Sequence, residues 1–288
     1  MNTIDCYLDI LPYDVLNIIA SNLNYFELVN FNKSIDKDND YFDTCEYTTI
    51  EKDIIDDIPI KFHNKIKVEK AYKFLICDDD LYRYRNVHTI KRFDDKINNI
   101  NMLINVVDID CSFTNVTNIS CLTKLRHLEC SHIDIIDVST LTNLIELNCS
   151  CCLNISDVYM LTNLQELYCS TTSITYVNSL TNLIILYCLN TNISDVSNLT
   201  KLKELNCSNT KITDVNMLVN LEILDCSECK IKDVSKLINL EYIECYNTDI
   251  QDVSMLPKLN KLVCDLTYFN ISNLSHVSSI ISCYRSRI

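Results

Sequence analysis

The chain contains no glycine and no tryptophan, and only three of its 288 residues are proline. Glycine adopts positive φ angles more readily than any other residue. We therefore expect the turns either to avoid positive φ or to place Asn and Asp there, because these two residues tolerate it best. The lack of glycine also excludes a glycine-rich phosphate-binding loop.

Basic residues and long apolar runs are scarce as well. The chain has 25 Lys and Arg against 39 Asp and Glu, which gives a net charge of −14. Because phosphate binding needs clustered Lys and Arg, this balance argues against a nucleic-acid partner. No segment approaches the roughly 20 apolar residues of a membrane-spanning helix. The opening MNTIDCYLDILPYD is acidic, so we expect neither a membrane span nor a secretory signal.

Cysteine, in contrast, is abundant and regularly spaced. The chain has 17 cysteines, and without a predicted secretory signal this number indicates a reducing compartment, so we expect a cytoplasmic location. Eight of the nine gaps in the main cysteine row are nineteen residues long, and one is twenty. The row consists of Cys111, Cys130, Cys149, Cys169, Cys188, Cys207, Cys226, Cys245, Cys264 and Cys283. A side chain that recurs in this way marks a repeated structural unit.

The repeat reads LxxLxCxxTxIxxVxxL. One copy consists of Leu202, Leu205, Cys207, Thr210, Ile212, Val215 and Leu218. Its first part alternates apolar and polar residues, which predicts a strand. Its later apolar residues come at every third position, which favours a tight turn or 3₁₀-like return over a long helix. One such unit cannot bury its own apolar face, so stacked units should form a solenoid.

The repeat resembles the leucine-rich repeat family, with Cys in the last apolar place of the strand motif LxxLxL. The segments ITDVNML, ISDVSNL and IKDVSKL resemble the return segments of internalin-like repeats. The resemblance implies an α/β leucine-rich repeat solenoid over residues 87–288, with a parallel sheet on the concave face, short turns or 3₁₀ segments on the convex face, and a protein-binding role. The composition and the Cys-bearing repeats also resemble leucine-rich repeat proteins of large DNA viruses, which implies a host cytoplasm.

Three departures from a regular repeat lead to expectations of their own. Threonine replaces the ladder Asn of the family and has one hydroxyl donor where Asn has two, so we expect the inner turn to be held less firmly than with Asn. Its members are Thr114, Thr172, Thr191, Thr210, Thr248 and Thr267, with Cys152 and Cys229 among them. The twenty-residue gap predicts a bulge near Leu153. In the last repeat, we expect Ile281 and Cys283 to keep the register, with Ser278 in a Leu position.

The N-terminal segment, residues 8–35, has a different pattern. Apolar residues at helical spacing follow a proline that suits a helix start. The segment resembles an F-box, which implies helices that bind the small Skp adaptor of a cullin-RING ubiquitin ligase through Leu11, Pro12, Val15, Leu16, Ile19, Leu23 and Leu28. The alternative is an amphipathic helix that only caps the solenoid. Residues 36–86 are interpreted as a connector and possible N-terminal cap.

Strand alternation predicts which residues face a partner, because neighbours of the inward Leu and Cys point to the concave face. That face should be acidic, with an apolar and aromatic centre. Aromatic residues ringed by polar groups are typical of protein-binding hot spots. The alternative is that exposed Tyr and Ile only pair across strands. The candidate partner-binding residues are Glu166, Tyr168, Ile185, Tyr187, Leu189, Glu204, Asn206, Tyr242, Glu244 and Tyr246.

The cysteine row itself predicts packing rather than chemistry. Side chains in a row point in parallel, whereas a disulfide needs a specific dihedral angle and zinc needs four converging ligands. Buried Cys then acts as a small hydrophobic residue. No nucleophile–base constellation is visible, so we expect no catalysis, no metal and no cofactor. The favoured interpretation is an F-box and leucine-rich repeat adaptor that recruits a protein to a ubiquitin ligase; the alternative is a scaffold or decoy without a ligase link.

Overall fold

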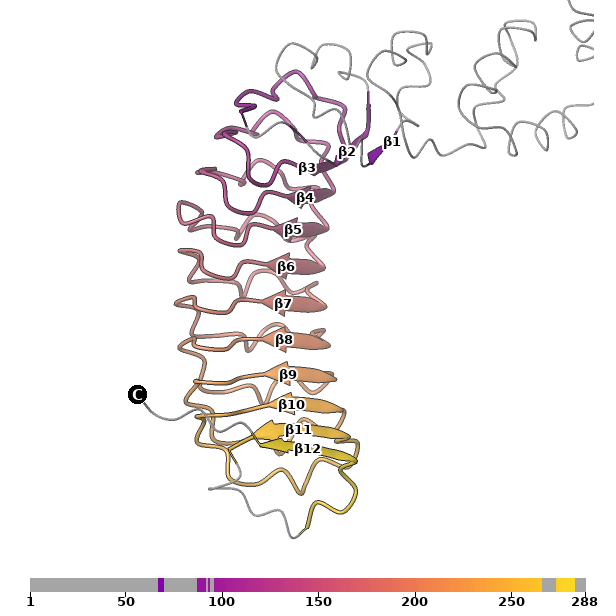
Figure 1. Ribbon diagram of the computed structural model, residues 1–288, viewed down its shortest axis with the longest axis vertical. Coiled ribbons are helices and arrows are strands. Elements are labelled where there is room, and N and C mark those ends of the chain that lie inside the picture. Colours follow the sequence, from indigo (N-terminus) through magenta and orange to yellow (C-terminus); the bar gives the residue numbers. More distant parts are fainter. Residues whose placement is uncertain (1–66, 70–86, 92, 94–95, 266–272, 283–288) are drawn as a thin grey trace, which may run out of the picture.

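The computed structural model describes residues 67–69, 87–91, 93, 96–265 and 273–282, which form one parallel sheet of twelve strands in sequence order. The strands lie one above the other and the returning loops lie on the opposite side (Figure 1). No helix is assigned within these residues. The strands are β1 (Lys67–Glu69), β2 (Thr89–Lys91), β3 (Asp108–Asp110), β4 (His127–Glu129), β5 (Glu146–Asn148), β6 (Glu166–Tyr168), β7 (Ile185–Tyr187), β8 (Glu204–Asn206), β9 (Ile223–Asp225), β10 (Tyr242–Glu244), β11 (Lys261–Cys264) and β12 (Ser279–Ser282).

The parallel β-solenoid predicted from the repeat is confirmed, and its register from β3 to β11 follows the cysteine spacing. Leu147 pairs with Leu167, and Leu205 pairs with Leu224. From β3 to β10 each strand has one buried residue between two half-buried ones. The repeated Leu, Ile, Val and Cys positions form one continuous buried cluster along the stack. The predicted F-box-like helices of residues 8–35 lie outside the described residues.

The convex side consists of tight turns. The amide of Leu180 donates to the carbonyl of Val177, and the amide of Leu183 donates to the carbonyl of Leu180, at 2.9 and 3.0 Å. These bonds span three residues, and the same pair recurs in other repeats. The apolar residues at every third position are therefore the corners of successive turns. The 3₁₀ alternative is not observed in the part that the structure describes.

The expectation that positive φ is avoided or reserved for Asn and Asp is wrong. The second residue after each described ladder cysteine from Cys111 to Cys245 has φ between 51° and 63°. Only three of these eight are Asn; the set is Phe113, His132, Cys151, Thr171, Asn190, Asn209, Glu228 and Asn247. The physical reason for the positive φ is a ladder of backbone hydrogen bonds that joins successive turns. In this conformation the backbone amide of Thr171 donates to Leu189 O of the next turn at 2.8 Å. The backbone amide of Glu228 likewise donates to Tyr246 O at 3.0 Å.

The row in the ladder-Asn position bonds in two different ways. The Thr191 hydroxyl donates to Cys188 O at 2.7 Å, which lies within its own turn. The Cys229 thiol instead donates to Cys207 O of the preceding turn at 2.9 Å. Cys152 makes the corresponding bond at 2.8 Å. Threonine in this row therefore closes a turn, whereas cysteine links two turns.

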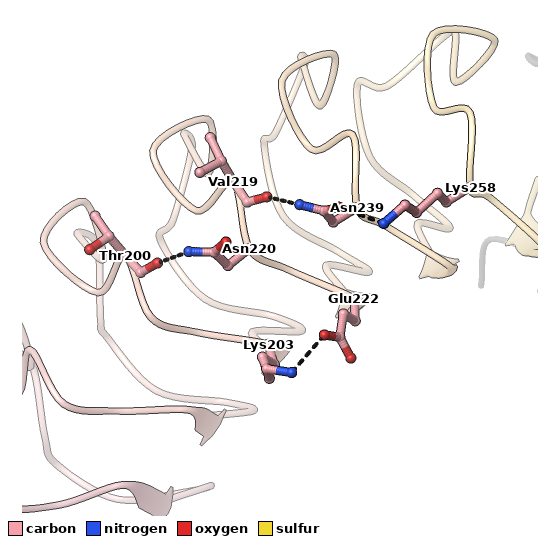
Figure 2. Close-up of polar contacts among 7 residues, drawn as sticks. All are labelled: Thr200, Lys203, Val219, Asn220, Glu222, Asn239 and Lys258. Atoms are coloured by element: carbon pink, nitrogen blue, oxygen red, sulfur yellow. Dashed lines mark hydrogen bonds and ion pairs between the residues drawn. The ribbon is translucent and has the colours of Figure 1, made fainter.

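An asparagine ladder nevertheless exists, at a position that the sequence analysis did not identify. Six residues before the ladder cysteines stands a row of Asn and Lys. Asn220 and Asn239 donate through Nδ2 to Thr200 O and Val219 O of the preceding turns, at 2.8 and 2.9 Å (Figure 2). Where Lys replaces Asn, its ammonium donates to the preceding Asn, as Lys258 does to Asn239 Oδ1 at 2.8 Å. The row joins the returns along the stack.

The register expected for the last repeat is wrong by one residue. Ile280, not Ile281, pairs with Leu262, and Ser282 pairs with Cys264. Ile281 is 43% exposed. The observed register places the apolar Val277 at a buried corner, where the expected register would have placed Ser278. Burial of Val277 at the corner therefore determines the register, although it places Ser282 instead of Cys283 beside Cys264. Cys283 lies outside the described residues.

Two further features concern the loop near Leu153 and the N-terminal end of the sheet. The extra residue of the long repeat is absorbed in the loop, because Leu153 is exposed while Cys152 and Ile155 remain buried and β5 and β6 stay in register. At the other end, β1 lies inside the segment 36–86 interpreted as connector or cap, and it pairs in parallel with β2. The sheet therefore begins before residue 87.

Candidate binding surface

Two rows of side chains cross the strands on the same face, as the pairing register shows. One row places Glu166, Ile185 and Glu204 side by side, and the other places Tyr168 beside Tyr187. All of these residues are half-buried. The partner-binding residues predicted for β6, β7 and β8 are thus brought together on adjacent strands. Leu189, just beyond β7, is also half-buried.

Tyr168 and Tyr187 form the centre of this surface. Their rings meet edge to face, with centroids 5.2 Å apart and an interplanar angle of 68°, a favourable aromatic geometry. The Tyr168 hydroxyl donates to Glu166 Oε2 at 3.0 Å, and the Tyr187 hydroxyl donates to Glu204 Oε2 at 3.3 Å. Each tyrosine is therefore held by its neighbour and by a carboxylate.

The tyrosine hydroxyls stay protonated at neutral pH. Burial raises the pKa of Tyr168, and the hydrogen bond and charge of Glu166 raise it further. Burial also raises the pKa of Tyr187, with a second contribution from the charge of Glu204. A protonated hydroxyl is a donor, as the two Tyr–Glu hydrogen bonds require.

A third Tyr–Glu pair lies towards the C-terminal end of the same sheet. The Tyr242 hydroxyl donates to Glu244 Oε2 at 2.8 Å. The ammonium of Lys261, on the next strand, lies 4.8 Å from the centre of the Tyr242 ring. This distance is within the range of a cation–π contact. Strand alternation predicted Tyr242 and Glu244 on one face, but it did not indicate the cation over the Tyr242 ring. Tyr246 is half-buried just after β10.

One predicted partner-binding residue, Asn206, already makes a hydrogen bond within the chain. Asn206 Oδ1 accepts the amide of Ser208 at 3.1 Å, so its carbonyl end stabilises the chain after β8. The neighbouring Ser208 and Ser227 are buried, and their hydroxyls have no hydrogen-bond partner. Asn206 therefore has a structural role beside its place on the surface.

The ladder cysteines are buried thiols. All thirteen described cysteines are free, and those of the ladder from Cys111 to Cys264 are buried. Burial is the first cause of the raised pKa of the Cys149, Cys169 and Cys188 thiols. No group of three or more potential metal-ligating side chains occurs among the residues described. Within the same residues, no helix is long and apolar enough to cross a membrane.

The fold and the repeat together resemble those of leucine-rich repeat solenoids. The family model "Leucine Rich repeats (2 copies)" matches residues 200–239. No curated protein sequence matches the chain significantly.

Many solved structures resemble the chain, among them the following three. The functional domain of InlJ from Listeria monocytogenes, described as including a cysteine ladder, is 26% identical with a TM-score of 0.63; the match covers 72% of this chain and 51% of that one. The chain thus spans about half of that domain. The internalin InlF of the same species is 21% identical over 78% of this chain and 83% of that one, with a TM-score of 0.59. A leucine-rich repeat protein of Leptospira interrogans is 18% identical over 76% of each chain, with a TM-score of 0.54.

These similarities support the leucine-rich repeat fold with internalin-like neighbours and a cysteine ladder. Repeats of this kind indicate a protein–protein interaction module. The residues predicted to bind a Skp adaptor all lie outside the described residues. The viral resemblance rests on composition and on the Cys-bearing repeats alone.

Proposed function

We propose that this protein captures a partner protein on its concave face, around Tyr168, Ile185 and Tyr187. The observation that carries the proposal is the half-buried Tyr168–Tyr187 pair, flanked by Glu166 and Glu204 and adjacent to Ile185. Aromatic and aliphatic groups ringed by charge are typical of binding hot spots. The proposed function is binding rather than catalysis, with no cofactor.

The surface can be tested without disturbing the core. Truncation of Ile185 and Tyr187 to Ala leaves the buried Leu186 and Cys188 of the same strand region intact. We expect the double variant to lose the partner in an affinity purification and to keep its circular dichroism spectrum. Asp108→Asn with Asp110→Asn, on β3, is the matched control on the same sheet. Partner capture by the Ile185→Ala, Tyr187→Ala variant at the wild-type level would refute the proposed surface.

The finer proposal is that residues 8–35 bind the Skp adaptor of a cullin-RING ligase, so that the captured partner becomes a ligase substrate. Its support is the sequence Leu11-Pro12 followed by Val15, Leu16 and Ile19. This role places the protein in the cytoplasm, in a host cell if the chain is viral. The second candidate is a scaffold or decoy whose N-terminal segment only caps the solenoid.

Co-purification with the Skp adaptor separates these candidates. We expect association with the wild-type chain and its loss in Leu16→Asp, while partner capture on the concave face persists. If neither chain binds the adaptor, the ligase proposal is wrong and the scaffold is favoured. If Leu16→Asp unfolds the solenoid, as judged by circular dichroism, residue 16 belongs to a cap.

A further inference from the structure

The sheet contains the same chemical unit three times, a tyrosine whose hydroxyl donates to a glutamate. The units are Tyr168 with Glu166, Tyr187 with Glu204, and Tyr242 with Glu244. In the third unit the chain supplies a cation of its own, because the Lys261 ammonium lies over the Tyr242 ring. The third unit therefore shows that a Tyr–Glu pair of this kind can accommodate a lysine side chain.

The first two units are adjacent and carry no cation from the described chain. Glu166 and Glu204 form no ion pair with any described Lys or Arg; the nearby Lys203 pairs with Glu222 at 2.8 Å (Figure 2). The two carboxylates lie on β6 and β8, on either side of β7, which carries Ile185 and Tyr187. Two negative charges and two aromatic rings thus lie around one apolar side chain.

This arrangement suits one long basic side chain. An aromatic face attracts a cation electrostatically, and the attraction strengthens where water is partly excluded. The hydroxyl donors hold the two carboxylates beside the rings, and Ile185 offers an apolar contact for the methylene stem of Lys or Arg. The surrounding charge also favours a basic side chain, because the negative charge of Glu146 contributes to the raised pKa of Tyr168. An acidic side chain would be repelled.

We propose that Glu166, Tyr168, Tyr187 and Glu204 form a docking site for a Lys or Arg side chain of the partner protein. This inference rests on the proposed function and adds the chemistry of the partner: a basic segment that lies along the concave sheet, with one cation held between β6 and β8. Tyr242, Glu244 and Lys261 are the intramolecular counterpart of that contact.

The test uses the full chain and a fluorescein-labelled tetra-arginine peptide, with binding followed by fluorescence anisotropy in 150 mM salt. We expect Glu166→Gln with Glu204→Gln to weaken binding by about 10-fold, and Tyr168→Leu with Tyr187→Leu to weaken it by a similar factor. Asp108→Asn with Asp110→Asn removes two charges at β3, roughly 14 Å from β6 by strand spacing. That distance exceeds the screening length of about 8 Å, so this control should lose less than about 3-fold.

Three results would overturn the inference: no saturable binding of tetra-arginine, equal weakening by the β3 control, or unchanged binding in the Tyr168→Leu, Tyr187→Leu variant. The thermal melts of all variants are compared with that of the wild type, so that unfolding is not mistaken for lost binding. If the peptide fails to bind while Ile185→Ala with Tyr187→Ala still abolishes partner capture, the proposed function stands and the cation site is wrong. If the peptide binds as expected but no protein is captured, the cation site stands and the proposed function is wrong.

Discussion

The Nδ2 of Asn239 donates a 2.9 Å hydrogen bond to the carbonyl oxygen of Val219, one turn earlier in the stack. Asn220 makes the same bond to Thr200 O. Side chains thereby join successive convex loops, while backbone ladders join the strands and the inner turns. The solenoid is thus cross-linked by hydrogen bonds on both sides of its core.

The Asn ladder should contribute measurably to stability. Asn239→Ala removes the donor to Val219 O and the acceptor of Lys258, so we expect a loss of about 1 kcal/mol in the free energy of unfolding, measured by urea denaturation. Lys258→Met leaves the Asn239–Val219 bond in place and should cost less than about 0.5 kcal/mol, because Lys258 is exposed. Equal stability of wild type and Asn239→Ala would show that the ladder contributes nothing.

Positive φ at a β-branched residue lowers the free energy of unfolding, and substitution by glycine removes this destabilisation. Thr171 has φ of 57° and Asn190 has φ of 58° in the equivalent place. The left-handed region costs most non-Gly residues roughly 1–2 kcal/mol, but glycine also loses more entropy on folding, by roughly 0.5–1 kcal/mol. We expect Thr171→Gly to raise the free energy of unfolding by about 0.5–1 kcal/mol. Asn190→Gly is the control and should change it little or lower it; a destabilised Thr171→Gly would contradict this account.

The buried thiols predict a loss of stability at alkaline pH. Burial raises the pKa of Cys149, Cys169 and Cys188 in the folded protein, so these groups stay protonated there. In the unfolded chain thiols ionise near pH 8.5, and unfolding then releases protons. The free energy of unfolding should therefore be unaffected by these groups below about pH 7.5. Above the unfolded value it should fall by about 1.4 kcal/mol per pH unit for each buried thiol.

Urea midpoints between pH 7 and pH 10.5 test this dependence. The Cys169→Ala, Cys188→Ala variant will be less stable at pH 7, because it leaves space in the core. Its stability should nevertheless fall less steeply above pH 9 than that of the wild type. Parallel pH profiles for the two proteins would mean that the ladder thiols do not set the alkaline limit.

The observed register of β12 leads us to predict that a cysteine in place of Ser282 stabilises the last repeat. Ser282 occupies the ladder position, and its hydroxyl is buried without a hydrogen-bond partner. A buried unsatisfied hydroxyl costs roughly 1–3 kcal/mol, so Ser282→Cys should stabilise the C-terminal repeat by about 1 kcal/mol. Hydrogen exchange of the β11 amides is the measurement, because it reports local opening. Slower exchange supports the observed register, whereas unchanged exchange would contradict it.

Much of this fold is predictable because the period of the cysteines determines the register. The strands, the buried Leu and Cys positions and the outward rows with Tyr168 and Tyr187 all follow from alternation. The Asn ladder was accessible to the same method, since Asn220 and Asn239 recur six residues before a ladder cysteine, but a polar surface row resembles ordinary solvated side chains. The positive φ at Thr171 could not be foreseen from residue preference, because hydrogen bonds between turns impose it.

The cation over Tyr242 was missed for a related reason. Pattern analysis places Tyr242 and Lys261 on one face, yet only side-chain positions show that the ammonium reaches the ring. The predicted register of β12 was wrong because it followed the cysteine spacing, whereas burial of Val277 at the hydrophobic corner determines the observed pairing.

Site-specific photo-crosslinking tests the central claim most directly, that a partner lies on the concave face. A benzophenone amino acid is placed at Tyr187 in one chain and at the exposed Tyr176 or Tyr159, in the returning loops, in two others. Crosslinking in cells, followed by mass spectrometry, identifies the attached protein. The account predicts one recurrent adduct from position 187 that is absent from positions 176 and 159. The same adduct from the returning loops, with none from position 187, would contradict it.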